Sequence, residues 1–414
     1  MVSLPVPSVQ LVAAPGTSLE MGRGGYEGTL EIAAYSAGLA AVESTTIDRY
    51  LLGISEVPSS WPAAALEAQA VAARTYLAWT LSRGRSINGT KYEYDICASQ
   101  YCQVYRGPRG SAESWADAVS STAREILVYE DRPAQALYSS SAGERTRSVQ
   151  DIWGGGGLPY LQAVDSPEME YTPYERWELT VSEDTFTRVF ARGGYSFGEA
   201  VTDVTLRSPG EGNGPEAVEV HTELGVTAVP ATRFRAIFNV HGPDLYPGLM
   251  PAARPSGGRW PQTILSYTFA VEYKPPSRAT HHLLPAGDSG APGVLTVIGE
   301  GWGHGVGMSQ WGAMAMATSG EPYEAILGLY YGLSPNDGGD MVPQTVLVGL
   351  EVERAQIAVT ADGPFQMIAP GFDPVSLSAG DWVLRRSGEG LIAIGPGGAV
   401  YDSALFRPPR LQPR

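Results

Sequence analysis

The longest helix-forming stretch constrains the fold most, because the sequences on either side of it have the patterns of strands. The stretch is SSWPAAALEAQAVAARTYLAWTLSRG, residues 59–84. Pro62 suits the first helical turn, where its missing N–H is harmless, and Gly84 suits the position just after a helix. Between them apolar residues recur at spacings of three and four, at Leu66, Ala70, Ala73 and Leu77. One long helix among strands predicts a mixed α+β fold.

Shorter patterns extend this prediction along the chain. The sequence EILVYEDRPAQALYSSSAG, residues 125–143, predicts a β-hairpin with its turn at Glu130–Pro133. Alternating apolar residues predict strands from 177 to about 273 and again from 342 to the end. Three further helices are predicted, at 114–124, about 308–318 and about 322–331. With 50 glycines and 32 prolines in no fixed period, many turns and a β-rich core are expected.

These patterns divide the 414 residues into four expected parts. They are an irregular N-terminal segment at 1–25, a core made of 26–174 and 291–335 whose helices line a groove, an inserted strand-rich domain at 175–290, and a small C-terminal β-module at 342–414.

Charge and hydropathy exclude several classes of partner. The net charge is −16 and Lys and Arg form no cluster, which argues against nucleic acid and against anionic membrane surfaces. No run of 18 apolar residues predicts a transmembrane helix. The opening residues, MVSLPVPSVQLVAAPG, do not have the pattern of an intact export signal. Whether such a signal was removed stays open.

Glu56, in ISEVPSSWP at 54–62, is the strongest candidate for a catalytic carboxylate. It precedes the long helix by several residues, behind a rigid Val57-Pro58 step. Apolar neighbours would raise its pKa by desolvation, as a general acid near neutral pH requires. The alternative is a structural role, in which Glu56 stabilises the N-terminus of the helix through the macrodipole.

Arg74 and two cysteines are interpreted as structural. Arg74 lies on the expected buried side of the long helix, so it needs a partner, and a structural ion pair is favoured over contact with a substrate. Cys97 and Cys102 lack the two further ligands that a zinc site needs, with no histidine near them in the sequence. No metal site is therefore predicted, and a disulfide or two free thiols stay open, the disulfide gaining weight if the protein is exported.

The stretch GWGHGVGMSQWGA, residues 301–313, places His304 among four glycines and ahead of a helix. Glycines permit positive φ or close backbone approach. One interpretation is a tight turn followed by a capped helix. The other is a ligand-binding wall in which His304, Ser309 and Gln310 offer hydrogen bonds and two tryptophans offer faces for sugar rings. The serines of ALYSSSAG, at 136–143, likewise fit either local turns or contacts to a polar ligand.

Five segments, taken together, carry a resemblance. In chain order they are IDRYLLGISEVPSSWPAAALEAQAVAARTYL, CQVYRG, ALYSSSAGERT with DIWGGGGLPYLQAVDSP, ATRFR, and GWGHGVGMSQWGAMAMATSGEPYEAILGLYY. They resemble the SpoIID/LytB family of bacterial cell-wall proteins over roughly residues 30–331. The most specific elements are Glu-x-Pro ahead of the alanine-rich helix and Gly-His-Gly-x-Gly-Met-Ser-Gln.

The resemblance implies a lytic transglycosylase, which cuts the β-1,4 bond between N-acetylmuramic acid and N-acetylglucosamine and leaves a 1,6-anhydro product. The glutamate of the family's Ser-Glu-x-Pro motif matches Glu56, which would act first as acid and then as base, with no cofactor. Residues expected to bind the glycan are Gln103, Tyr105, Tyr138, Ser140, Ser141, His304, Ser309 and Gln310. The expected partner is the glycan strand of peptidoglycan, and the expected location is extracellular or in the cell envelope.

Members of the LytB type imply an alternative, a non-catalytic enhancer of an N-acetylmuramoyl-L-alanine amidase or a glycan-binding protein, with that amidase as partner. The sequence also departs from the family pattern. Val57 stands where Met is usual, and Ala142-Gly143-Glu144 where Ser-Gly-Gly is common. Some relatives hold zinc through a histidine that has no counterpart near Cys97. The preference for denuded or peptide-bearing glycan and the oligomeric state stay open.

Overall fold

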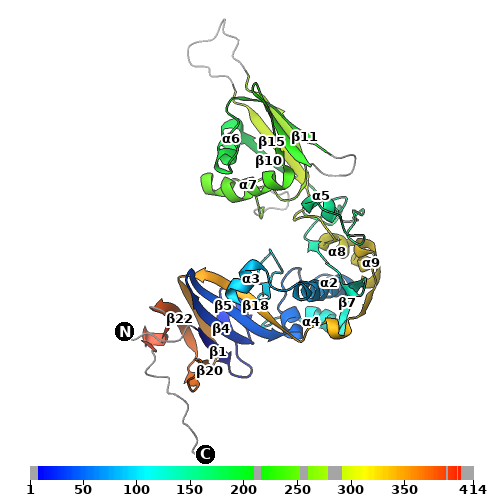
Figure 1. The fold of residues 1–414 in the computed structure, drawn as a ribbon. Helices are drawn as coiled ribbons and strands as arrows, with labels where there is room; N and C mark the ends of the chain where they lie inside the picture. The colour runs from blue at the N-terminus through cyan, green and yellow to red at the C-terminus, as the bar shows by residue number, and fades with distance from the viewer. Residues whose placement is uncertain are drawn as a thin grey trace, which may run out of the picture. The chain divides into compact units, whose positions relative to one another are not determined.

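The computed structural model describes residues 8–208, 216–251, 260–277, 291–387, 390–398 and 400–401. The chain forms two compact units, shown in Figure 1. The terminal unit comprises Met1–Ala136 and Ser334–Arg414, and the central unit comprises Leu137–Leu333. Each contains helices and several sheets, so the mixed α+β class is confirmed at this level. No helix in the described ranges is both long and apolar enough to cross a membrane.

A seven-stranded sheet organises the terminal unit, in the order β21-β20-β1-β4-β5-β18-β6. β4 and β5 pair antiparallel, and β18 lies antiparallel on the other side of β5. One face buries Val9, Leu30, Ile32 and Val348 completely. The strands are β1 (Ser8–Ala13), β4 (Thr29–Tyr35), β5 (Gly38–Thr46), β6 (Ile96–Cys97), β18 (Thr345–Arg354), β20 (Phe365–Ile368) and β21 (Val375–Leu377).

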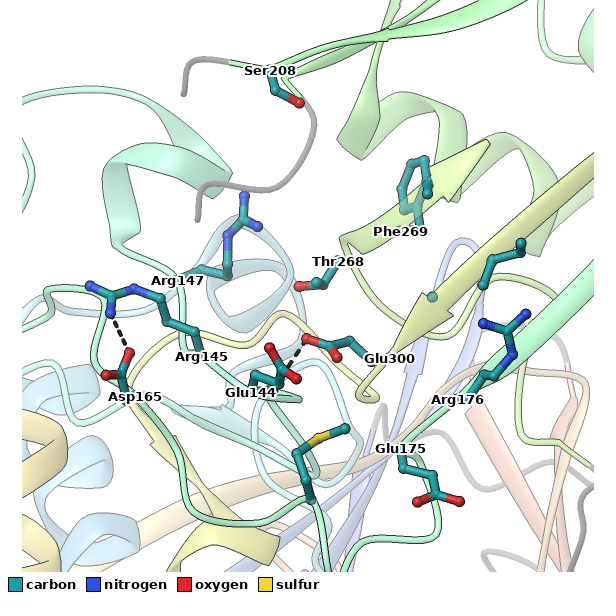
Figure 2. Close-up of a pocket in the computed structure, with 14 residues that line it drawn as sticks. Glu144, Arg145, Arg147, Asp165, Glu175, Arg176, Ser208, Thr268, Phe269 and Glu300 are labelled. Carbon is teal, nitrogen blue, oxygen red and sulfur yellow. Dashed lines mark hydrogen bonds and ion pairs between the residues drawn. The ribbon is translucent and has the colours of Figure 1, made fainter. Parts of the chain in front are cut away.

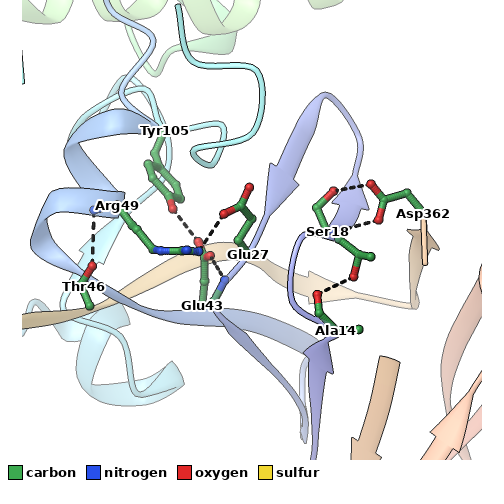
Figure 3. Close-up of polar contacts among 10 residues, drawn as sticks. Ala14, Ser18, Glu27, Glu43, Thr46, Arg49, Tyr105 and Asp362 are labelled. Carbon is green, nitrogen blue, oxygen red and sulfur yellow. Dashed lines mark hydrogen bonds and ion pairs between the residues drawn. The ribbon is translucent and has the colours of Figure 1, made fainter. Parts of the chain in front are cut away.

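A six-stranded sheet, ordered β24-β23-β22-β19-β2-β3, also joins the two ends of the chain. Its strands are β2 (Leu19–Met21), β3 (Gly24–Tyr26), β19 (Gln356–Ala361), β22 (Gly380–Ser387), β23 (Gly390–Ile394) and β24 (Val400–Tyr401), with 3₁₀ turns η1 (Gly339–Met341) and η2 (Pro396–Gly398) nearby in the chain. The backbone N–H of Ser18 donates to the Asp362 carboxylate at 2.6 Å (Figure 3). This hydrogen bond connects the residue before β2 to the residue after β19.

The strand pairing differs from two of the sequence-based expectations. Residues 1–25 were expected to be irregular, but β1, β2 and most of β3 fall there, because Val9, Leu11 and Leu19 are buried against C-terminal strands. Residues 342–414 were expected to form a separate module, yet their strands share both large sheets with the N-terminal strands. Pairing between the two ends of the chain leaves no local periodic signal, so the sequence pattern did not reveal it.

The two longest described helices of the terminal unit confirm predicted helices. α2 (Ala63–Ser82) begins directly after Pro62 and packs against α4 (Glu113–Ser121) and β7 (Glu125–Tyr129). The four predicted apolar positions of α2 are completely buried: Leu66, Ala70, Ala73 and Leu77. The predicted hairpin is formed by β7 and β8 (Arg132–Pro133), with β17 (Pro335–Asp337) on its other edge. The remaining helices are α1 (Ile47–Leu52) and α3 (Ile87–Tyr92).

The central unit contains two three-stranded sheets, β10-β15-β14 and β11-β12-β13, and the parallel pair β9 and β16. The strands are β9 (Tyr138–Ser139), β10 (Trp177–Ser182), β11 (Val201–Arg207), β12 (Ala217–Thr222), β13 (Gly225–Pro230), β14 (Thr268–Lys274), β15 (Val294–Glu300) and β16 (Met308–Ser309). The helices are α5 (Val149–Trp153), α6 (Glu183–Arg192), α7 (Ala231–Leu245), α8 (Gln310–Thr318) and α9 (Tyr323–Tyr331). The last two confirm predicted helices.

The sequence analysis did not predict α5, α6 or α7 of the central unit. The longer two are α6 and α7. They lie beside the β10-β15-β14 sheet (Figure 1) and share one core with it, in which Phe186, Phe190, Phe234 and Phe238 are completely buried. Phe234 and Phe238 have helical spacing. The segment that contains them follows directly on a strand, however, and its apolar residues continue the alternating pattern of that strand. This is why the segment 217–240 was interpreted as strands alone.

Candidate active site

Glu56 lies in the loop that joins α1 to α2 in the terminal unit. One of its carboxylate oxygens accepts a hydrogen bond from the backbone N–H of Val104 at 2.6 Å. The backbone N–H of Ser55 donates to the Val104 carbonyl at 2.8 Å, and Ile54 forms a β-bridge with Tyr105. Backbone hydrogen bonds therefore hold the Glu56 loop against the 104–105 segment and orient a carboxylate that remains half-buried.

A pocket of about 380 Å³ in the terminal unit is lined by Glu56 and its neighbours. Among the described residues that line it, Glu56 is the one carboxylate, and Arg23, Arg106 and Arg109 give the wall positive charge. Trp115 closes one side and is fixed by donating its indole N–H to the Leu51 carbonyl at 2.9 Å. A volume of this size is in the range of small-ligand sites. A single acid that a ligand can reach suits proton transfer.

Gln103 and Tyr105 were expected to touch the glycan, but the structure buries both. Gln103 accepts from the Tyr50 hydroxyl at 2.7 Å and donates to the Ala73 carbonyl at 3.1 Å. Tyr105 stacks on Tyr50 and donates to the carboxylate of Glu43 at 2.6 Å (Figure 3), and burial raises the pKa of Glu43. Gln103 and Tyr105 therefore hold the chain on either side of Val104 in place. This structural role differs from the predicted contact with a ligand.

Arg74 and the cysteines have the structural roles expected, with one difference. Arg74 is 2% exposed and donates to the Val119 and Glu125 carbonyls at 3.0 and 3.1 Å. Its hydrogen-bond partners include main-chain oxygens near the end of α4 and at the start of β7, and within the described residues no carboxylate forms a salt bridge with it. Burial lowers the pKa of Arg74 to about 10. Cys97 and Cys102 form a disulfide just ahead of Gln103.

The glycine-rich loop 301–307 shapes the second set of predicted residues, in the central unit. Gly301, Gly303, Gly305 and Gly307 all have positive φ. A Cβ at Gly307 would lie 2.0 Å from the Leu137 carbonyl oxygen, so close backbone approach requires glycine there. The loop leads into β16, which pairs with β9 and so brings Ser309 beside Ser139. The tertiary pairing thus gathers the serine and histidine motifs, which are distant in sequence.

His304 is half-buried at the tip of this loop. Its Nδ1 accepts from the backbone N–H of Val306 at 3.0 Å, and its ring lies 5.3 Å from that of Trp153. Burial and the positive charge of Arg235 lower the pKa of His304 to about 4. The imidazole is therefore neutral near pH 7 and suits hydrogen bonding rather than charge pairing.

Glu168, which the sequence did not single out, lies at the centre of this part of the unit. It is completely buried and accepts hydrogen bonds from the hydroxyls of Ser141, Ser166 and Ser309 and from the Gly143 backbone N–H. Ser309 also caps α8. No local pattern around Glu168 signals this role, because its partners come from distant segments.

The predicted residues of the central unit therefore differ in access. Tyr138, Ser140 and His304 are partly exposed and are available to a ligand. Ser141, Ser309 and Gln310 are buried. Since Ser141 and Ser309 are bound to Glu168, they hold the loops in place, which differs from the predicted contact with a glycan. In the described ranges no group of three or more His, Cys, Asp or Glu side chains is arranged to hold a metal ion.

Comparisons with known proteins agree with the motifs. Residues 35–129, which contain Glu56, match the SpoIID family model, described as stage II sporulation protein. Stage II sporulation protein D of Bacillus subtilis is 26% identical over 73% of this chain and 77% of its own length. An uncharacterized protein of Brachyspira hyodysenteriae is 27% identical over 74% of this chain and 70% of its own. The amidase enhancer of Bacillus subtilis is 24% identical over 67% of this chain and 38% of its own.

The match, the relatives and the site motifs agree with one another. Residues 35–129 match the SpoIID family model, and 73% of the chain is similar to stage II sporulation protein D of Bacillus subtilis.

Proposed function

We propose that this protein is a lytic transglycosylase of the cell envelope that cleaves the β-1,4 bond between N-acetylmuramic acid and N-acetylglucosamine in peptidoglycan. One observation carries the proposal. Glu56 occupies the Ser-Glu-x-Pro position within the matched domain and is the one carboxylate among the residues lining its pocket, oriented by the Val104 N–H. The names of the relatives, a sporulation protein and an amidase enhancer, support a role in the cell wall.

The chemistry needs one carboxyl group that changes its role. Protonated Glu56 donates its proton to the glycosidic oxygen as the bond to C1 of N-acetylmuramic acid breaks. The N-acetyl group of the same sugar shields the positive charge that develops at C1. Ionised Glu56 then takes the proton of the C6 hydroxyl, whose oxygen attacks C1 and closes the 1,6-anhydro ring. No water enters the product, so a second catalytic acid is not needed.

The residues around Glu56 support this role in distinct ways. The Val104 N–H holds one carboxylate oxygen of Glu56 and so keeps the carboxyl group in a defined geometry for proton transfer. The buried pair Gln103 and Tyr105 holds the segment that carries Val104. In the central unit, Tyr138, Ser140 and His304 remain proposed glycan-binding residues, because each is partly exposed.

The test is mass spectrometry of the products released from purified sacculi, both intact and after amidase treatment. The wild-type protein releases 1,6-anhydro-muropeptides or anhydro-disaccharides, and Glu56→Gln does not. Glu20→Gln is the matched control, because Glu20 is an exposed glutamate on β2 of the same unit. An unchanged rate of release in Glu56→Gln overturns the assignment of the catalytic residue.

A second candidate function rests on the similarity to the amidase enhancer. In that case the protein binds glycan or the amidase and cleaves nothing itself. Product release then requires an added N-acetylmuramoyl-L-alanine amidase, the products carry no anhydro ring, and Glu56→Gln acts like the wild type. The same assay therefore separates the two functions.

A further inference from the structure

A second pocket, of about 840 Å³, is lined by residues of the central unit, and none of its described lining residues belongs to the Glu56 loop. Figure 2 shows it between β14, the end of β15 and the segment 144–147. Its wall combines the charged side chains of Arg147, Glu144 and Glu300 with the apolar side chains of Phe269 and Ile298. The proposed mechanism uses none of these residues.

Arg147 is unusual among the charged residues of this pocket. It is 4% exposed, and within the described residues its Nε–H has no hydrogen-bond partner and its guanidinium forms no ion pair. The two other arginines that line the pocket are both paired, Arg145 with Asp165 and Arg176 with Glu178. The pocket thus holds a buried guanidinium that the described residues leave without a hydrogen bond or an ion pair.

An unpaired buried charge is costly to a fold, because the group loses its hydration without a compensating partner. Burial lowers the pKa of Arg147, and the negative charge of Asp151 acts in the opposite direction. The Asp151 side chain already takes part in the N-terminal cap of α5. A site that tolerates this cost is one where a ligand provides the missing partner. The planar guanidinium matches a carboxylate with two parallel hydrogen bonds.

The backbone fixes the position of Arg147 beside the glycine-rich loop. Its N–H donates to the Gly305 carbonyl at 2.7 Å, and residues 147 and 306 form a parallel β-bridge. A Cβ at Gly305 would lie 3.2 Å from Cγ of Arg147, so a side chain there would crowd the arginine stem. Gly305 also has positive φ, which a side chain would strain. The glycine-rich loop that carries His304 therefore fixes the backbone position of Arg147 and leaves room for its side chain.

We propose that Arg147 binds a carboxylate of peptidoglycan in this pocket. The inference rests on the proposed function and names the part of the substrate that the central unit takes. Two carboxylates share this chemistry: the lactyl group of a muramic acid without its peptide, and the terminal carboxylate of a stem peptide. Glu144 and Glu300 then accept from N–H or O–H groups of the ligand, and Phe269 and Ile298 cover its apolar face.

The test is calorimetric titration of the full chain with two pairs of ligands. The first pair is N-acetylmuramic acid and its methyl ester, and the second is a stem tetrapeptide and its C-terminal amide. We expect one acid to bind at least about ten-fold more tightly than its neutral counterpart, as a charge-assisted hydrogen bond in a buried site gives. The pair that shows this preference identifies the source of the carboxylate.

Variants then assign the preference to Arg147. Arg147→Gln loses it, whereas Arg188→Gln, an exposed arginine on α6 in the same unit, retains it. Equal binding of acid and neutral ligands by the wild type, no binding of either acid, or a preference retained in Arg147→Gln overturns the inference. The wild-type comparison needs no variant, so it stands even where Arg147→Gln does not fold. Anhydro-product release without acid preference refutes this inference alone, and acid preference without release refutes the proposed catalysis alone.

Discussion

Glu56 in the terminal unit and Glu168 in the central unit are the same residue type in contrasting surroundings. Glu56 is half-buried, lines a pocket and accepts from the Val104 N–H. Glu168 is completely buried and accepts four hydrogen bonds, from three serine hydroxyls and one backbone N–H. A carboxylate with its acceptor sites filled by the fold holds loops together. A carboxylate that reaches a pocket can exchange a proton with a ligand.

The same contrast separates the predicted binding residues. Those whose polar atoms are filled by protein partners, such as Gln103 and Ser309, support the site from behind. Those that stay partly exposed, such as His304 and Ser140, remain available to a ligand. Side-chain chemistry alone does not distinguish the two groups, whereas burial and hydrogen-bond partners do.

Substitution of Glu56 should have the strongest consequence, a loss of product release. In Glu56→Gln, the rate of anhydro-product release falls by at least about 100-fold, because the amide cannot transfer the proton. Its free energy of unfolding, from urea denaturation, changes by less than about 1 kcal/mol, as for a residue outside the core. A large loss of stability together with the loss of activity would show that Glu56 is structural.

The next effect is the reverse case at Glu168. Glu168→Gln places an amide N–H₂ among hydroxyl and backbone donors, so we expect the free energy of unfolding to fall by about 3 kcal/mol. Urea denaturation followed by circular dichroism measures this. Glu170→Gln, an exposed glutamate two residues away, is the control. Stability equal to that of the wild type would contradict the role given to Glu168.

The free energy of unfolding should depend on pH through His304. Its folded pKa, about 4, is below the usual 6.5, so the unfolded chain binds a proton more readily than the folded chain does. The stabilisation is present above pH 6.5 and is lost as the pH falls toward 4, by up to about 3 kcal/mol. His304→Gln should therefore show a shallower decline in unfolding free energy between pH 6.5 and 4. Parallel profiles for the two proteins would contradict this.

The weakest effect should come from the disulfide between Cys97 and Cys102, which precedes the segment that contacts Glu56. Replacing Cys97 and Cys102 with serine removes a short covalent loop, which lowers the free energy of unfolding by about 2 kcal/mol. Anhydro-product release should fall less than in Glu56→Gln, because the disulfide acts only through the 103–105 segment. Thermal denaturation under non-reducing conditions measures the first effect. Identical melting of the wild type and the double variant would show that the disulfide does not stabilise the unit.

Features with local signals could be predicted from the amino-acid sequence. The periodicity and Pro62 predicted α2, the stretch after the glycine-rich loop predicted α8, and the order of short motifs indicated the resemblance and Glu56. Each of these depends on residues within a few turns or strands of one another.

Which polar residues are buried, and what they contact, depends instead on how distant segments pack together. Glu168 collects its partners from segments that begin at residues 141 and 309, and the two ends of the chain pair in common sheets. Among the residues that the structure describes, none pairs with the guanidinium of Arg147 in its pocket, a property that depends on the neighbouring side chains. Such features arise from contacts between distant segments, and burial sets the energy of a charge only once those contacts exist.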